Sequence, residues 1–155
     1  MPTIFTAPKV EVMPQRQFAG LVRRYDMQTR GAIPAQWGDY NGMAALPYSV
    51  PDAWYGVCYN FGAGMSFDYL SGQEVTGVAD LPSGFAAVSI IGAYARFATK
   101  GHISTMQAAW GEIHGDWLKR ADYSPRHGPS VEFYPPAFNG MTGEGGWEIW
   151  VPVAG

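Results

Sequence analysis

An internal repeat constrains the fold of this chain more than any other feature of its sequence. The stretch at residues 18–25 is echoed at residues 85–97, and each stretch leads through a glycine to a Trp-Gly-acidic motif, at Trp37 and at Trp110. Self-similarity on this scale indicates two copies of one supersecondary unit. Because 155 residues are few for two ordinary domains, we expect residues 1–155 to form a single domain that contains both units.

Each half of the chain combines one helical pattern with several strand patterns. Apolar residues spaced three and four apart from Ile103 predict an amphipathic helix that ends near Lys119 and Arg120. A shorter helix is predicted over residues 33–41, with Pro34 in its first turn. Alternating or apolar runs predict strands at residues 9–13, 18–25, 54–61, 67–75, 85–97, 130–134 and 147–153.

This order predicts an α+β fold of duplicated β-α-β-β units with pseudo-two-fold symmetry. The strands would form an antiparallel sheet, and both helices would cover one of its faces. The opposite face would then be covered by loops or left as a concave groove between the halves. We take that groove as the candidate ligand site.

Composition excludes several classes of function. The net charge is −3 and no Lys/Arg cluster occurs, so we expect no direct binding to nucleic acid. No apolar run approaches the roughly 20 residues that a membrane helix needs, and no signal peptide is evident. Cys58 is the single cysteine, which fits a reducing compartment, and we expect a cytoplasmic protein. Aromatic residues make up 15% of the chain, enough for a thick core and also for a ligand pocket.

The order and spacing of several short motifs resemble one family. The motifs are Phe18-Ala19-Gly20, Ile33-Pro34 with Trp37, Tyr55 to Tyr59, Phe67-Asp68-Tyr69, Gly101, Trp110 with Trp117-Leu118, Glu132 with Tyr134, and Ile149 to Val153. Over residues 9–153 the chain resembles the GyrI-like small-molecule-binding domain, also called the AraC-type effector-binding domain. The resemblance implies a groove for lipophilic, often cationic, drug-like ligands. Many such domains are attached to DNA-binding domains in multidrug-responsive transcription regulators, whereas we expect a stand-alone form here.

The resemblance places Glu132 at the family's groove glutamate, and alternation along its strand puts Tyr134 on the same face. A solvated Glu132 paired with a basic residue is the alternative from pattern alone. Aromatic residues on neighbouring elements complete the expected ligand-binding set, and any of them could instead belong to the core. They are Trp37, Tyr55, Tyr59, Phe67 and Tyr94.

The sequence assigns no functional role to several other tryptophan, acidic, cysteine and histidine side chains. Helical spacing assigns Trp110, Ile113 and Trp117 to the core, and Glu112 and Asp39 to solvent. Cys58 is interpreted as a small buried hydrophobe rather than a nucleophile. The three histidines, His102, His114 and His127, lack metal-ligand spacing, so we expect no metal site and no cofactor.

Three functions stay open at this point, and the fold's haem-binding relatives alone suggest a fourth, haem binding. The first is a small-molecule-binding protein without catalytic residues. The second is a hydrolase of an electrophilic ligand in the same groove, with Glu132 as general base. The third, implied by the gyrase-inhibiting relatives, is a protein that acts on a partner such as a regulator or a topoisomerase.

Overall fold

The computed structural model describes residue 5, residues 8–118 and residues 124–154. Its strands are β1 (Lys9–Tyr25), β2 (Trp54–Tyr59), β3 (Phe67–Glu74), β4 (Phe85–Thr99), β5 (Ser130–Tyr134) and β6 (Trp147–Pro152). Its helices are α1 (Ile33–Asn41) and α2 (Met106–Glu112). A 3-10 turn, Ile103–Thr105, precedes α2, and a wider π-helical turn, Ile113–Trp117, follows it. No described helix has both the length and the apolar character needed to cross a membrane.

The elements match the periodic patterns of the sequence, with one informative difference. Two segments expected as separate strands form the continuous strand β1, whose pairing with β4 shifts register between Met13 and Arg16. Pro14 lies within this shift and has no backbone N–H to donate, so an irregularity there lets the strand continue. The predicted end of the second helix, near Lys119 and Arg120, lies outside the described residues.

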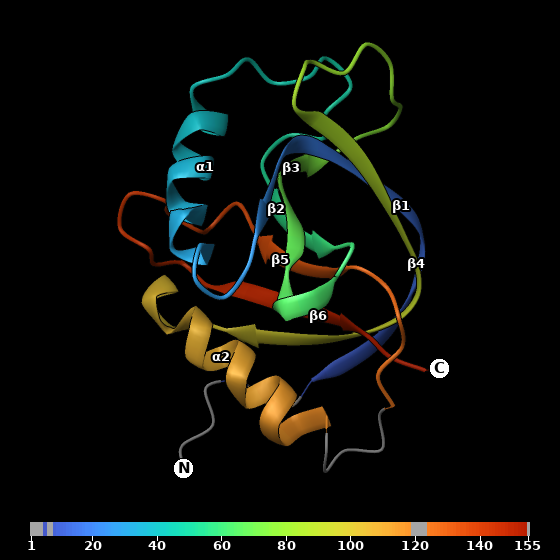
Figure 1. Ribbon diagram of the computed structural model, residues 1–155, viewed down its shortest axis with the longest axis vertical. Coiled ribbons are helices and arrows are strands. Elements are labelled where there is room, and N and C mark those ends of the chain that lie inside the picture. The colour runs from blue at the N-terminus through green and yellow to red at the C-terminus, as the bar shows by residue number, and fades with distance from the viewer. Residues whose placement is uncertain (1–4, 6–7, 119–123, 155) are drawn as a thin grey trace.

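The six strands form a closed antiparallel ring in the order β1-β3-β2-β5-β6-β4. Within the first unit the order is β1-β3-β2, and within the second it is β4-β6-β5. The units meet at the β2-β5 and β1-β4 pairs, which is the arrangement that a duplicated β-α-β-β chain predicts. Both helices lie on the same side of the ring (Figure 1).

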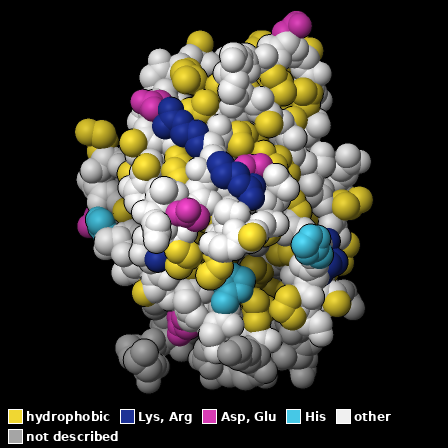
Figure 2. Space-filling model, in the orientation of Figure 1, with side chains coloured by type: hydrophobic (Ala, Val, Ile, Leu, Met, Phe, Trp, Pro, Cys, Tyr) yellow, Lys and Arg dark blue, Asp and Glu magenta, His cyan; other side chains and the backbone are white. Residues whose placement is uncertain are grey.

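Closure of the ring divides the apolar residues into two cores. An inner core, in which Phe18, Val57, Leu70 and Trp150 are fully buried, fills the face away from the helices. An outer core joins α2 to the sheet and includes Ile113. Hydrophobic side chains also reach the molecular surface between basic and acidic ones (Figure 2).

Candidate functional site

A cavity of about 1170 Å³ lies between the two helices and the outer face of the sheet. This is the helix-bearing face, so the expectation of a groove on the opposite face is wrong. The opposite face closes on itself and is filled by the inner core. The residues that matter most below are the lining side chains Met27, Trp37, Trp54, Cys58, Phe61, Met65, Phe67, Tyr69, Met106, Trp110, His114, Glu132 and Tyr134.

Glu132 is the acidic side chain among the described lining residues, and only 6% of its surface is exposed. Its Oε1 accepts hydrogen bonds from the Tyr69 hydroxyl at 2.7 Å and the Tyr134 hydroxyl at 3.0 Å. Its Oε2 accepts one from Trp110 Nε1 at 3.1 Å. Three donors on β3, β5 and α2 therefore hold one carboxyl group in a fixed orientation.

The first helix reaches the same carboxyl group through a relay. Trp37 Nε1 on α1 donates to the Tyr69 hydroxyl at 2.9 Å, and that hydroxyl donates onward to Glu132. Trp37 and Trp110 are the tryptophans of the two Trp-Gly-acidic motifs, so both halves of the duplication converge on Glu132. A chain of polarised hydrogen bonds of this kind strengthens each member in a low-dielectric site.

Burial and hydrogen bonding act on Glu132 in opposite directions. Burial raises the pKa of its carboxyl group, and the bonds from Tyr69, Trp110 and Tyr134 oppose part of that rise. Burial also raises the pKa of both phenols well above the usual range, and the charge of Glu132 adds to the effect. The two tyrosines are therefore held as protonated donors to the carboxyl group.

Gly56 makes this arrangement possible. It pairs with Glu132 across the β2-β5 ladder, and Tyr69 on β3 reaches over it to meet the carboxyl group. A Cβ atom at this position would lie 2.8 Å from Glu132 Oε1 and in steric contact with the Tyr69 hydroxyl. Glycine therefore leaves the space through which the tyrosine passes.

The structure brings four of the seven proposed ligand-binding residues to the cavity. Glu132 and Tyr134 lie on its floor, Trp37 comes from α1, and Phe67 comes from β3. The Trp37 and Tyr134 rings are 5.7 Å apart and nearly perpendicular. Whether these side chains contact a ligand stays a prediction.

The other three proposed residues are separated from the cavity. Tyr55 and Tyr94 are buried in the inner core, and Tyr59 packs against it. Alternation along β2 explains the placement of Tyr55 and Tyr59, because the residues that precede each of them, Trp54 and Cys58, line the cavity and the tyrosines face the other way.

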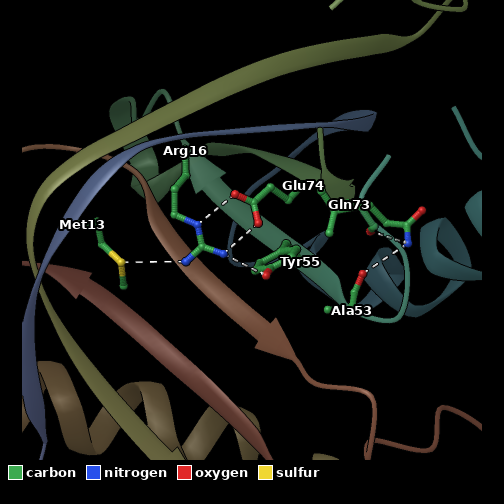
Figure 3. Close-up of polar contacts among 7 residues, drawn as sticks. Met13, Arg16, Ala53, Tyr55, Gln73 and Glu74 are labelled. Carbon is green, nitrogen blue, oxygen red and sulfur yellow. Dashed lines mark hydrogen bonds and ion pairs between the residues drawn. The ribbon is translucent and has the colours of Figure 1, made fainter. Parts of the chain in front are cut away.

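Two of these tyrosines have structural partners instead of a place in the cavity. The Tyr55 hydroxyl accepts a hydrogen bond from Arg16 Nη2 at 3.1 Å, and Arg16 also pairs with Glu74 at 2.9 Å (Figure 3). Tyr94 donates to the Pro129 carbonyl at 2.9 Å.

Trp110 is the main functional candidate that sequence reasoning missed. The helical stripe assigned it to the core, but its indole both packs at the edge of the outer core and donates to Glu132. The repeat contains the signal that could have found it, since Trp110 corresponds to Trp37. The assignment of this helical face to the core was correct for Ile113, which is fully buried, and for Trp117, which packs against the outer core.

Cys58 and His114 also line the cavity. Burial, with a smaller effect of Glu132, raises the pKa of the Cys58 thiol well above its usual range, so the thiol stays neutral. His114 stacks on Trp110 with ring centroids 5.6 Å apart, and burial lowers its pKa. Within the described part of the chain, no group of three His, Cys, Asp or Glu side chains could hold a metal ion.

The remaining polar candidates have structural roles. His102 precedes the helical segment and accepts a hydrogen bond from the Ser104 backbone at 3.1 Å. Asp39 forms an ion pair with Arg23 at 2.6 Å, and both side chains are exposed, as expected for a solvated position.

The protein is a closed duplicated sheet with a carboxyl group in a cavity between two helices, and it can be compared with known proteins on that basis. The model of the GyrI-like small molecule binding domain matches residues 6–154. This chain belongs to that family. No curated protein matches the GyrI-like chain in sequence.

Several solved structures share this GyrI-like fold at low sequence identity. An integron cassette protein from Vibrio cholerae is 17% identical, with a TM-score of 0.72 and coverage of 97% of both chains. The protein SAV2435, solved with tetraphenylphosphonium bound, is 15% identical, with a TM-score of 0.73 and coverage of 97% of this chain and 95% of that one. EcmrR, solved in a DNA complex, is 13% identical, with a TM-score of 0.63 and coverage of 97% of this chain and 57% of the EcmrR chain.

Proposed function

We propose that this GyrI-like domain binds a lipophilic cation, with Glu132 as the counter-charge. The observation that supports the proposal is a carboxyl group, 6% exposed, that three donors orient within an aromatic cavity. An ionised carboxylate in such a site is costly to desolvate, and a ligand cation compensates that cost. The faces of Trp37, Trp110 and Tyr134 add cation-π attraction of up to about 2 kcal/mol each when desolvated.

The three donors also favour one kind of cation. Oε1 already accepts two hydrogen bonds and Oε2 accepts one, so the carboxyl group has little remaining capacity for a ligand N–H. A quaternary or otherwise donor-free cation gains the Coulomb attraction without needing that bond. The tetraphenylphosphonium bound to SAV2435 is a cation of this kind.

The test compares a cation with a neutral ligand of similar shape. Tetraphenylphosphonium and triphenylphosphine oxide are titrated into the wild type and into Glu132→Gln by calorimetry. We expect the substitution to weaken phosphonium binding more than about tenfold, or about 1.4 kcal/mol, and to leave the oxide nearly unchanged. Glu144→Gln, which neutralises an exposed carboxylate on the β5-β6 loop, is the matched control. Equal losses for both ligands would show that the charge of Glu132 does not select the cation.

Hydrolysis of an electrophilic ligand is a second candidate. The raised pKa of Glu132 favours it, because a general base works best when its pKa approaches the working pH. Turnover of a reactive epoxide or cyclopropane that stops in Glu132→Gln, with binding retained, would support a hydrolase. Binding without turnover across a panel of such compounds would remove this candidate. Action on a regulator or topoisomerase stays a prediction of the sequence resemblance.

A further inference from the structure

The cavity extends from Glu132 to a rim of exposed apolar side chains. Met27, Phe61 and Met65 line the cavity, and their exposed fractions are 45%, 52% and 68%. We call these three residues the apolar rim. Single exposed hydrophobic residues are ordinary on a protein surface, whereas several beside one cavity mark a contact surface.

The apolar rim lies well beyond the reach of a group that contacts Glu132. Gly56 stands opposite Glu132, Cys58 lies two residues further along β2, and Phe61 follows beyond the end of that strand. At about 3.3 Å per strand residue, Cys58 is roughly 7 Å from the level of Glu132, and Phe61 lies on the order of 10–15 Å away. The volume of about 1170 Å³ also exceeds the roughly 1,000 Å³ of the largest ordinary ligand pockets.

Polar contacts fix the β2-β3 turn, which carries Phe61 and Met65 of the apolar rim. Arg24 Nη1 donates to the Asn60 carbonyl at 2.8 Å and to Asp68 Oδ1 at 3.1 Å. Its Nη2 donates to Ser66 Oγ at 3.0 Å. Asn60 and Met65 both adopt positive φ angles, 54° and 58°, which side chains other than glycine rarely do. The β2-β3 turn is therefore fixed in a shape that keeps Phe61 and Met65 at the mouth of the cavity.

Phe67 connects the apolar rim to the aromatic interior. Its ring lies 6.4 Å from that of Phe61 and also lines the cavity. His114, one helical turn beyond Trp110, also lines the cavity. A continuous path of apolar and aromatic surface thus leads outward from Glu132.

We propose that the ligand is an elongated amphiphilic cation, whose charged head lies near Glu132 and whose apolar tail extends to the apolar rim. This inference rests on the proposed function and adds the shape of the ligand to it. A compact cation would contact Glu132 and leave the outer part of the cavity empty. A tail that reaches Phe61 and Met65 would remove their exposed surface from water as well as its own.

The test uses alkyltrimethylammonium ions from hexyl to dodecyl, titrated by calorimetry below their micelle concentrations. In the wild type, each added methylene that is buried should raise affinity by up to about fourfold. In the variant Phe61→Ala/Met65→Ala, hexyl affinity should stay within about twofold while dodecyl affinity falls about tenfold or more. Met141→Ala is the matched control, because Met141 is 95% exposed and lies outside the cavity lining.

The outcomes separate this inference from the proposed function. If hexyltrimethylammonium binds in a manner that depends on Glu132 but longer tails add nothing, the proposed function stands and the elongated ligand is refuted. The same refutation follows if the dependence on tail length survives in Phe61→Ala/Met65→Ala. If no ammonium or phosphonium ion binds the wild type, the proposed function itself fails.

Discussion

The substitution Gly56→Ala tests the carboxyl centre directly, because it adds one methyl group where three strands meet. The new Cβ would lie 2.8 Å from Glu132 Oε1 and would collide with the Tyr69 hydroxyl. Gly56 is paired on both sides, with Ser71 on β3 and Glu132 on β5, so the backbone has little freedom to move away. The fully buried Tyr69 side chain must therefore shift and give up its bond to Glu132.

Three contributions set the expected size of the effect. Overpacking a buried position costs about 1–3 kcal/mol. Loss of a hydrogen bond to a charged group costs about 1.5–3 kcal/mol. Replacing a strand glycine by alanine returns about 0.5–1 kcal/mol of backbone entropy. We therefore expect Gly56→Ala to lower the free energy of unfolding by about 1.5–5.5 kcal/mol, which corresponds to a fall in Tm of roughly 3–22 °C for a chain of this size.

The assay is thermal and urea unfolding of the ligand-free protein, together with calorimetric titration of tetraphenylphosphonium. The matched control is Gly111→Ala on α2, where an added Cβ meets nothing within 4 Å and should stabilise the helix by about 0.5–1 kcal/mol. Phosphonium affinity should fall in Gly56→Ala and hold in Gly111→Ala. Wild-type stability and affinity in Gly56→Ala would refute the contact of Tyr69 with Glu132 across this glycine.

Four further predictions concern the same cavity. Burial raises the pKa of Glu132 above its ordinary 4.5, so phosphonium affinity should fall as pH drops through that raised pKa. The phosphonium affinity of Glu132→Gln should not change over the same pH range. Since the pKa of Glu132 is raised in the folded state, its carboxyl group adds to the free energy of unfolding below pH 4.5, and this contribution is lost as pH rises through the folded-state pKa. Unfolding of the ligand-free wild type and of Glu132→Gln at several pH values tests the direction of this change. Trp110→Phe removes the donor to Oε2, whose hydrogen bond lowers the pKa of Glu132, so the midpoint of the affinity profile should move to higher pH, and an unmoved midpoint would contradict that bond. The neutral Cys58 thiol should react slowly with iodoacetamide at neutral pH, and more slowly with ligand bound, as mass spectrometry would show.

The fold could be predicted because its signals are local and repeated. Alternation and helical spacing fix the elements, and the duplication fixes how the two units relate. Closure of the ring could not be predicted from the same signals, because it depends on long-range pairs between units, such as Val57 with Val131. Without closure the inner face looks like an open groove, and that is why the cavity was expected on the wrong side.

The candidate site was predictable only in part, for a related reason. Alternation places Glu132 and Tyr134 on one face, but it does not say which face of β2 turns toward them. Tyr55 and Tyr59 were therefore chosen, whereas the cavity contains Cys58 from the intervening positions. Tyr69 could not be identified, because its contact depends on the absence of a side chain at Gly56, a feature of neither strand alone.

The duplication explains how a single carboxyl group can be held so completely. The first unit supplies a donor from β3, which Trp37 on α1 supports in turn, and the second supplies donors from β5 and α2, so both units hold the carboxyl group. The acid itself occurs once, with Gly56 facing it on the paired strand. A second carboxylate at that position would repel the first and would occupy the space that Tyr69 needs. One acid opposite one glycine, between two related tryptophans, is therefore the arrangement in which two similar halves form one binding centre rather than two.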